Sequence, residues 1–146
     1  MINRLQYSVA GQNLTKMFES CRLVAYPDLK GIWTVGWGHV GPEVREGYTI
    51  TQVQADAQLV VDYQFAVNAV NALVWVQLTQ GEFDAVVDFC YNCGVNAFKG
   101  STMLILLNRS DFTSAALEFA KWSHASGQVV AGLLRRRLAE KAEFES

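Results

Sequence analysis

The sequence lacks long apolar runs. Its longest uninterrupted apolar stretches are only a few residues, as at Leu104–Leu107. A membrane-spanning helix needs about 20 mainly apolar residues, and a signal peptide needs an apolar core of about 7–15 residues after a basic start. We therefore expect neither a signal peptide nor a membrane anchor, and no stable association with a membrane.

The sequence also lacks an excess of charge of one sign. Twelve Lys and Arg residues stand against 14 Asp and Glu residues, which gives a formal net charge of −2. A protein that binds nucleic acid over a broad surface carries a clear basic excess. We therefore expect no nucleic-acid partner.

Cysteine is sparse, with only Cys21, Cys90 and Cys93. This odd number, without the spacing of small secreted domains, is typical of a chain that folds in a reducing cytoplasm. The Cys-x-x-Cys pair would suit a redox or zinc site, but zinc needs two more ligands, and only Cys21 and His39 are candidates. Cys90 and Cys93 follow Val86 by four and seven residues, at helical spacing. We predict that both thiols are small apolar core residues and that no metal binds.

The chain does have ample apolar material. Hydrophobic residues make up 51% of its 146 residues and charged residues 18%, which is enough for one core in one domain of ordinary size. We predict a single α+β domain over residues 1–146. Its β-containing lobe covers about 20–50, a joining helix about 51–73, and a larger helical lobe about 79–146 together with the N-terminal helix.

The first third of the chain combines a helix with a hairpin. Leu14, Phe18 and Cys21 recur at helical spacing, which predicts a helix that ends near Glu19–Cys21. Turn residues then separate two β-rich runs, which predicts a small β-hairpin. The strands of this hairpin are Leu23–Tyr26 and Ile32–Val35, with a third short strand near Tyr48–Ile50.

The rest of the chain contains residue patterns that are typical of helix N-termini. Thr51 stands three residues before Gln54, and Thr79 three before Glu82, a spacing that satisfies free N–H groups at a helix N-terminus. The first of these helices, about 22 residues or about 33 Å long, can join two lobes. Ser101 and Asp111 are N-cap candidates for helices over about 102–107 and 112–122, and a last helix covers about 132–144.

Three residues of the hairpin region suggest acid–base chemistry. Glu19 ends an apolar helix, where a carboxyl loses hydration and can keep a proton, so it is a candidate general acid. Asp28 lies on a polar turn, stays ionised and can take a proton from water, which Thr34 can hold. Two carboxyls in different environments are what cleavage of a glycosidic bond needs, although both are also common as solvated surface groups.

The pattern Glu-x8-Asp-x5-Thr resembles the active-site region of the phage-type lysozymes, the endolysins of glycoside hydrolase family 24. The resemblance spans nearly the whole chain. The matching residues are Phe18-Glu19, Ala25-Tyr26, Thr34-Val35-Gly36, Gly38-His39, Gln80 through Ala85, Asn92 through Gly94, Ala97-Phe98, Ser101-Thr102, Gly132-Leu133 and Arg135-Arg136.

The resemblance implies a lysozyme-like fold and a monomeric muramidase. Such an enzyme hydrolyses the β-1,4 bond between N-acetylmuramic acid and N-acetylglucosamine in bacterial peptidoglycan, without cofactor, for bacteriolytic host-cell lysis. Glu19 would be the acid, and Asp28 and Thr34 would orient water in an inverting mechanism. The alternatives are a lytic transglycosylase, which uses a lone Glu, and an inactive peptidoglycan-binding or structural module.

The resemblance also implies substrate contacts by Val40, Tyr91, Asn92 and Ser101. Core packing is the alternative role for Val40 and Tyr91, and an N-cap is the alternative for Ser101. Without an export signal, the enzyme is expected to stay in the host cytoplasm until lysis, when a separately made membrane hole gives it access to the periplasmic wall.

Three further residues are expected to support the site. Family members keep a structural histidine at the position of His39, and we expect Asp62 to pair with it, with backbone contacts as the alternative. Of the basic run Arg135–Arg137, at most one or two side chains can face inward on a helix. We choose Arg136 as the one that pairs with Glu19.

Overall fold

The computed structural model describes all residues, 1–146, as seven α helices, one short 3-10 helix and four short strands. Contacts divide the chain into two compact units, one of residues 15–64 and one of residues 1–14 and 65–146. The helical majority with small antiparallel sheets confirms the predicted α+β class. None of the helices combines the length and apolarity that a membrane crossing requires.

The unit of residues 15–64 contains the predicted hairpin. Strand β1 (Arg22–Pro27) pairs antiparallel with β2 (Trp33–Gly36), with Tyr26 opposite Thr34. The expected third strand is reduced to a single bridge between Val24 and Thr49. The small core under the hairpin consists of Ala25, Val35 and Val44, packed by Trp33, Tyr48 and Ile50.

Helix α2 (Gln52–Leu73) has the predicted length of 22 residues. Its start has the expected reciprocal cap, because the Thr51 N–H donates to the Gln54 side chain (2.9 Å) and the Gln54 N–H donates to the Thr51 hydroxyl (3.2 Å). The boundary between the two compact units falls inside this helix, between residues 64 and 65.

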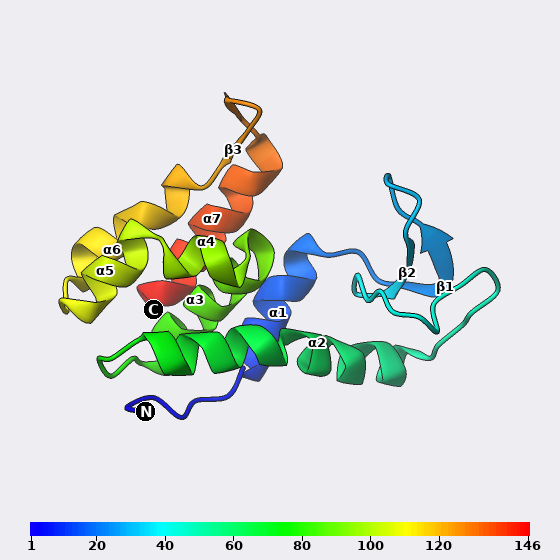
Figure 1. Cartoon of the computed structure of the whole chain (residues 1–146), viewed down its shortest axis with the longest axis horizontal. Coiled ribbons are helices and arrows are strands. Elements are labelled where there is room, and N and C mark those ends of the chain that lie inside the picture. The colour runs from blue at the N-terminus through cyan, green and yellow to red at the C-terminus, as the bar shows by residue number, and fades with distance from the viewer. The chain divides into compact units, whose positions relative to one another are not determined.

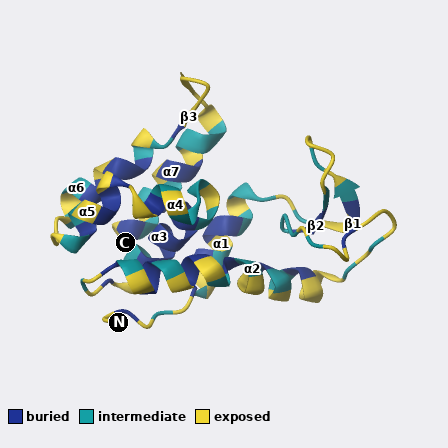
Figure 2. Ribbon diagram, viewed as in Figure 1, coloured by how far each residue is buried: buried dark blue, intermediate teal, exposed yellow.

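The unit of residues 1–14 and 65–146 is built around helix α3 (Gln80–Cys93), which packs against α7 (Ala131–Phe144) (Figure 1). Every residue of α3 from Phe83 to Cys90 is buried, as the dark ribbon of Figure 2 shows. The capping box of Thr79 and Glu82 is present at its start. This confirms the helix start that the spacing of Thr79 and Glu82 predicts.

The shorter helices follow their predicted caps. Ser101 caps α5 (Thr102–Asn108), and Asp111 caps α6 (Phe112–Glu118), which continues as the 3-10 helix η1 (Phe119–Lys121). Two elements were not predicted: helix α4 (Val95–Lys99), of five residues, and a hairpin of β3 (His124–Ala125) and β4 (Gln128–Val129). Both are too short to produce a periodic pattern.

Helix α1 (Val9–Phe18) begins at a point where glycine is required. A Cβ added to Gly11 would lie 2.5 Å from the ring of Tyr7 and 2.9 Å from the carboxyl carbon of Asp84. The Tyr7 hydroxyl donates to the Gly11 carbonyl (2.7 Å), and the N–H of Ser8 donates to the buried carboxylate of Asp84 (3.1 Å). The missing side chain therefore lets α1 approach α3 closely.

We predict that Gly11→Ala destabilises the protein by about 1–3 kcal/mol, because the tyrosine ring and the carboxylate must move apart. Gly132 is a matched control, since its added Cβ would meet only the Arg135 side chain at 3.8 Å in helix α7. Gly132→Ala should stabilise the protein by up to about 1 kcal/mol. Thermal or urea unfolding measures both values, and equal effects of the two substitutions would contradict this account.

Candidate active site

Asp28 lies on the turn that joins β1 to β2, and its carboxylate organises that turn. Its Oδ1 atom accepts from the N–H groups of Lys30 and Ile32, each at 2.8 Å. The Asp28 N–H donates to the carbonyl of Ile32 (2.9 Å) and closes the hairpin. Both carboxylate contacts use Oδ1, so Oδ2 remains available to water at this half-buried position.

Thr34 lies on the returning strand, opposite Tyr26, and is 5% exposed. Its hydroxyl donates to the carbonyl of Ile32 (2.9 Å), the same carbonyl that accepts from Asp28. A hydroxyl has one proton to donate but two lone pairs. The Thr34 oxygen can therefore still accept a hydrogen bond, but it has no second proton to give.

Glu19 follows the last residue of α1, and its N–H still donates to the carbonyl of Thr15 (3.1 Å). The carboxylate lies against the turn after β2, because a Cβ added to Gly38 would be 4.0 Å from Glu19 Oε2. Gly38 has φ +93°, a conformation that L side chains rarely adopt. Glu19, Asp28 and Thr34 thus belong to the same compact unit.

A polar cluster fixes the end of α1 to the start of α2. Asp56 accepts from the indole N–H of Trp37 (2.8 Å) and from Gln52 (3.1 Å), and it pairs with Lys16 (3.2 Å). The Lys16 ammonium also lies 5.4 Å from the centre of the Trp37 ring. The bond from Trp37 is the main cause that lowers the pKa of Asp56. Sequence patterns did not reveal this cluster, which connects distant parts of the chain.

The expected pair between His39 and Asp62 is present, with His39 Nδ1 2.9 Å from Asp62 Oδ2. Sequence analysis missed a second partner, Glu43, whose Oε1 atom lies 2.7 Å from His39 Nε2. Burial lowers the pKa of His39, but the bonds and charges of Glu43 and Asp62 outweigh it and raise the pKa above 6.5. The bond from His39 lowers the pKa of Glu43.

The other predicted contact residues differ in exposure. Val40, in the unit of Glu19, is 50% exposed rather than packed in a core. In the other unit Tyr91 is half-buried, with its ring centre 5.7 Å from that of Phe65. Asn92 is exposed, and its Oδ1 atom accepts from Arg137.

Ser101 has the alternative role that sequence analysis left open, that of an N-cap. Its hydroxyl donates to the carbonyl of Phe98 (2.7 Å) and accepts from the N–H of Leu104 (3.1 Å). The residue is 3% exposed. The Ser101 hydroxyl therefore acts inside the fold, as the N-cap of α5.

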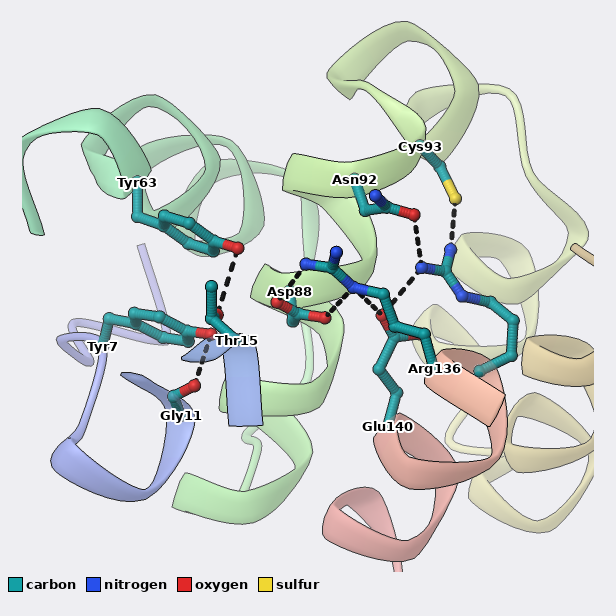
Figure 3. Close-up of polar contacts among 10 residues, drawn as sticks. Tyr7, Gly11, Thr15, Tyr63, Asp88, Asn92, Cys93, Arg136 and Glu140 are labelled. Carbon is teal, nitrogen blue, oxygen red and sulfur yellow. Dashed lines mark hydrogen bonds and ion pairs between the residues drawn. The ribbon is translucent and has the colours of Figure 1, made fainter. Parts of the chain in front are cut away.

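Arg136 lies in a buried group of charges between α7 and α3 (Figure 3). Its guanidinium donates to both oxygens of Asp88, from Nε and Nη2, each at 2.9 Å. Asp88 was not among the predicted partners, and the expected pairing of Arg136 with Glu19 stays a prediction. Arg137 is also buried while Arg135 is exposed, so two of the three arginines face inward, within the predicted limit.

Glu140 completes this group, 3.0 Å from Arg137 and 3.7 Å from Arg136. Burial, followed by the bond and charge of Asp88, raises its pKa well above the usual range, against the opposing effect of the two arginines. Sequence analysis named neither Arg137 nor Glu140 as site residues. Their i, i+3 spacing on a helix was the available signal.

The two neighbouring cysteines differ. Cys90 is fully buried, and burial raises the pKa of its thiol to about 12, in keeping with the predicted apolar role. Cys93 is only half-buried, and its sulfur accepts from Nη1 of Arg137, so the prediction of a simple core residue was wrong for Cys93. No group of three or more His, Cys, Asp or Glu residues is arranged to hold a metal ion.

Two pockets lie elsewhere in the units. One, of about 490 Å³, is lined by Phe112, Leu117, Lys141 and Phe144 among others, and one of about 310 Å³ by Val35, His39 and neighbouring residues. Neither pocket includes Glu19, Asp28 or Thr34.

We predict that His39→Asn and Asp62→Asn each destabilise the protein and that the double variant costs clearly less than the sum, with a coupling of about 0.5–3 kcal/mol. Because the folded pKa of His39 is raised, the pair contributes fully below the unfolded pKa of about 6.5. The contribution is lost as pH rises through the folded pKa, and it fades again in strong acid as the carboxylates take up protons.

Unfolding at several pH values measures the coupling, and NMR titration measures the pKa of His39. Glu43→Gln is the control for the second partner and should lower the pKa of His39 while leaving the Asp62 contact in place. Additive losses in the double variant, or a His39 pKa at or below 6.5, would contradict the pairing.

Comparisons with known proteins identify relatives over nearly the whole chain. The family model described as phage lysozyme matches residues 16–140. The endolysin of Acyrthosiphon pisum secondary endosymbiont phage 1 is 41% identical over 97% of this chain and 99% of its own length. The endolysin of Bacillus phage PZA is 42% identical over 97% of this chain, which spans only 56% of that relative.

Solved structures agree with the sequence matches. A crystal structure of a P22 lysozyme mutant superposes with a TM-score of 0.90 at 37% sequence identity, and the match covers 97% of this chain and 99% of that one. This similarity confirms the predicted lysozyme-like fold. The chain belongs to the phage lysozyme family of enzymes.

Proposed function

We propose that this chain is an endolysin that hydrolyses the β-1,4 bond between N-acetylmuramic acid and N-acetylglucosamine in bacterial peptidoglycan. Glu19 is the general acid, and Asp28 and Thr34 position the attacking water. Family membership supports the reaction class, and the geometry of the hairpin supports the roles of the residues. The chain needs no cofactor for this reaction, since all proton transfers use its own carboxyl groups.

The observation that carries the proposal is the hydrogen bonding of Asp28 and Thr34. Asp28 offers its Oδ2 atom only as an acceptor, and Thr34 has already used its proton on the carbonyl of Ile32. A water molecule bound to both must donate both of its protons. Its remaining lone pairs then point away from the protein and are free to attack a sugar carbon.

The reaction follows as a single displacement. Glu19 gives its proton to the glycosidic oxygen as the bond from that oxygen to C1 of the muramic acid breaks. The water oxygen bonds to C1 from the opposite face while Asp28 takes one of the water protons, so the configuration at C1 inverts. Solvent then returns a proton to Glu19 and removes the one on Asp28, which restores the starting state.

The products distinguish this reaction from that of a lytic transglycosylase, which closes the muramic acid onto itself without water. Mass spectrometry of fragments released from purified peptidoglycan is the test. Hydrolysis leaves reducing-end sugars, whereas transglycosylation leaves anhydro ends 18 Da lighter, the mass of the missing water. Release of no fragments would favour the inactive peptidoglycan-binding or structural module.

The biological setting belongs to the same proposal. The enzyme acts as a monomer on the periplasmic cell wall during host lysis, and it stays in the host cytoplasm until the membrane is opened. The related endolysins of phages support this setting. A turbidity assay on permeabilised Gram-negative cells, with intact cells as the control, tests whether the wall is reached only after the membrane is breached.

We predict that Glu19→Gln lowers the rate of peptidoglycan hydrolysis at least 100-fold, because the amide keeps the shape but has no proton to give. Unfolding stability should change little, since Glu19 lies at a half-buried helix end. Glu46→Gln, at an exposed position of the same unit, is the matched control and should keep full activity. A Glu19→Gln rate above about a hundredth of that of the unchanged protein would refute the assignment.

Asp28→Asn gives a separate prediction for the water-positioning carboxylate. The amide oxygen can keep both bonds from Lys30 and Ile32, so the hairpin should remain folded. The amide cannot take a proton from water, so the rate should fall about 100-fold or more. Circular dichroism checks the fold, and a fully active, folded Asp28→Asn protein would show that another group activates the water.

A further inference from the structure

Arg137 reaches from α7 to the C-terminal end of α3, and none of its side chain is exposed. Its Nη2 donates to the side-chain oxygen of Asn92, and its Nη1 donates to the sulfur of Cys93. The guanidinium also lies 3.0 Å from Glu140 and 5.3 Å from the centre of the Phe89 ring. A cation at this position is further favoured by the dipole of α3, which ends at Cys93.

This contact fixes the polarity of the Asn92 amide, that is, which of its two ends faces the guanidinium. A guanidinium has only donors, so the Asn92 atom that faces Arg137 must be the carbonyl oxygen. The two ends of an asparagine amide are otherwise hard to tell apart, and the donor-only partner removes the ambiguity. The NH2 group of Asn92 therefore points away from the buried guanidinium.

The exposure of Asn92 and the burial of its partners determine which end of the amide can reach a ligand. Asn92 is exposed, whereas Arg137 and Glu140 are each 0% exposed. The amide is anchored from inside by a charged group and offers two N–H donors toward solvent. An exposed asparagine without such an anchor can rotate to offer either its donors or its acceptor, so Arg137 makes this position selective for acceptors.

We propose that Arg137 is a positioning residue that presents the Asn92 amide to the 2-acetamido carbonyl of a peptidoglycan sugar. The inference rests on the function proposed above, because it takes an N-acetylated glycan as the ligand. A sugar hydroxyl can donate or accept and would not require a fixed donor, whereas a carbonyl oxygen only accepts. Ring and glycosidic oxygens also only accept, but a carbonyl oxygen is the stronger acceptor, and the acetamido carbonyl is the one carbonyl that both sugars of the polymer share.

Asn92→Asp is the sharpest variant. The carboxylate can still accept from Arg137, in a stronger charge-assisted bond, so the fold and the anchor remain. It then presents an oxygen where the NH2 group was, and two acceptors repel. We expect the affinity for the N-acetylglucosamine pentamer to fall about tenfold or more, with binding measured by calorimetry in the Glu19→Gln background to prevent turnover.

The control for the added negative charge is Asn96→Asp, an exposed asparagine four residues along the chain, which should leave the affinity unchanged. The glucose pentamer has the same linkage with a hydroxyl in place of each acetamido group, and it is the control ligand. Asn92→Asp should reduce the preference for the N-acetylated pentamer over the glucose pentamer. A purely structural effect would weaken both ligands equally.

Arg137→Lys tests the positioning role. Lysine keeps the charge near Glu140 but has a single ammonium in place of the planar fork that serves Asn92 and Cys93 together. We expect it to reduce the same preference, whereas Arg135→Lys, at an exposed position of α7, should not. In the unchanged protein, the side-chain N–H signals of Asn92 should shift in NMR spectra when the N-acetylated pentamer binds.

The outcomes separate this inference from the proposed function. If the protein hydrolyses peptidoglycan but Asn92→Asp leaves the preference for the N-acetylated pentamer intact, the inference is wrong and the function stands. That result would also be expected if Asn92 bound the lactyl or peptide groups, which the pentamer lacks. If the unchanged protein cleaves no peptidoglycan, the proposed function itself has failed.

Discussion

The buried ion pair between Arg136 and Asp88 is the interaction on which the larger unit depends. It joins the two helices at the centre of that unit, α3 and α7, through two parallel bonds of 2.9 Å. Removing charges from water is costly, and loss of one partner of such a pair costs about 3–5 kcal/mol because the other charge stays buried. The pair therefore ties α7 to one register on α3. That register also carries Arg137 to the end of α3, so the ion pair and the residue that positions Asn92 are neighbours in the same helix.

The smaller unit, residues 15–64, holds its reactive groups in place without a large core. Its core under the hairpin has only three buried apolar residues, Ala25, Val35 and Val44. Hydrogen bonds do the remaining positioning: Asp28 is fixed by two backbone N–H groups, and Asp56 connects Trp37 and Lys16. Each proton donated in this way is no longer available to a ligand. The hydrogen bonds that stabilise the hairpin thus also determine which atoms can act on water.

Much of the fold could be predicted from local sequence signals, because these signals act over only a few residues. The caps at Thr51, Thr79, Ser101 and Asp111 needed no knowledge of distant parts of the chain. The elements that were missed, α4 and the hairpin of β3 and β4, are shorter than the stretches of about 11–18 residues for a helix and about 4–8 residues for a strand over which a periodic pattern can be recognised. The Ser126-Gly127 turn, where both residues have positive φ, was the one available signal for that hairpin.

The candidate site was harder to predict because its contacts join residues far apart in the sequence. Resemblance to a family supplied Glu19, Asp28 and Thr34, and it also supplied Asn92, but resemblance carries no information about which atom of a side chain faces solvent. Asn92 and Arg137 lie 45 residues apart, and no spacing rule connects them. Only the three-dimensional contact shows that a donor-only group faces the amide, and from that contact the polarity follows. The chemistry of the buried partner of a side chain therefore determines which ligand groups the exposed end of that side chain can recognise.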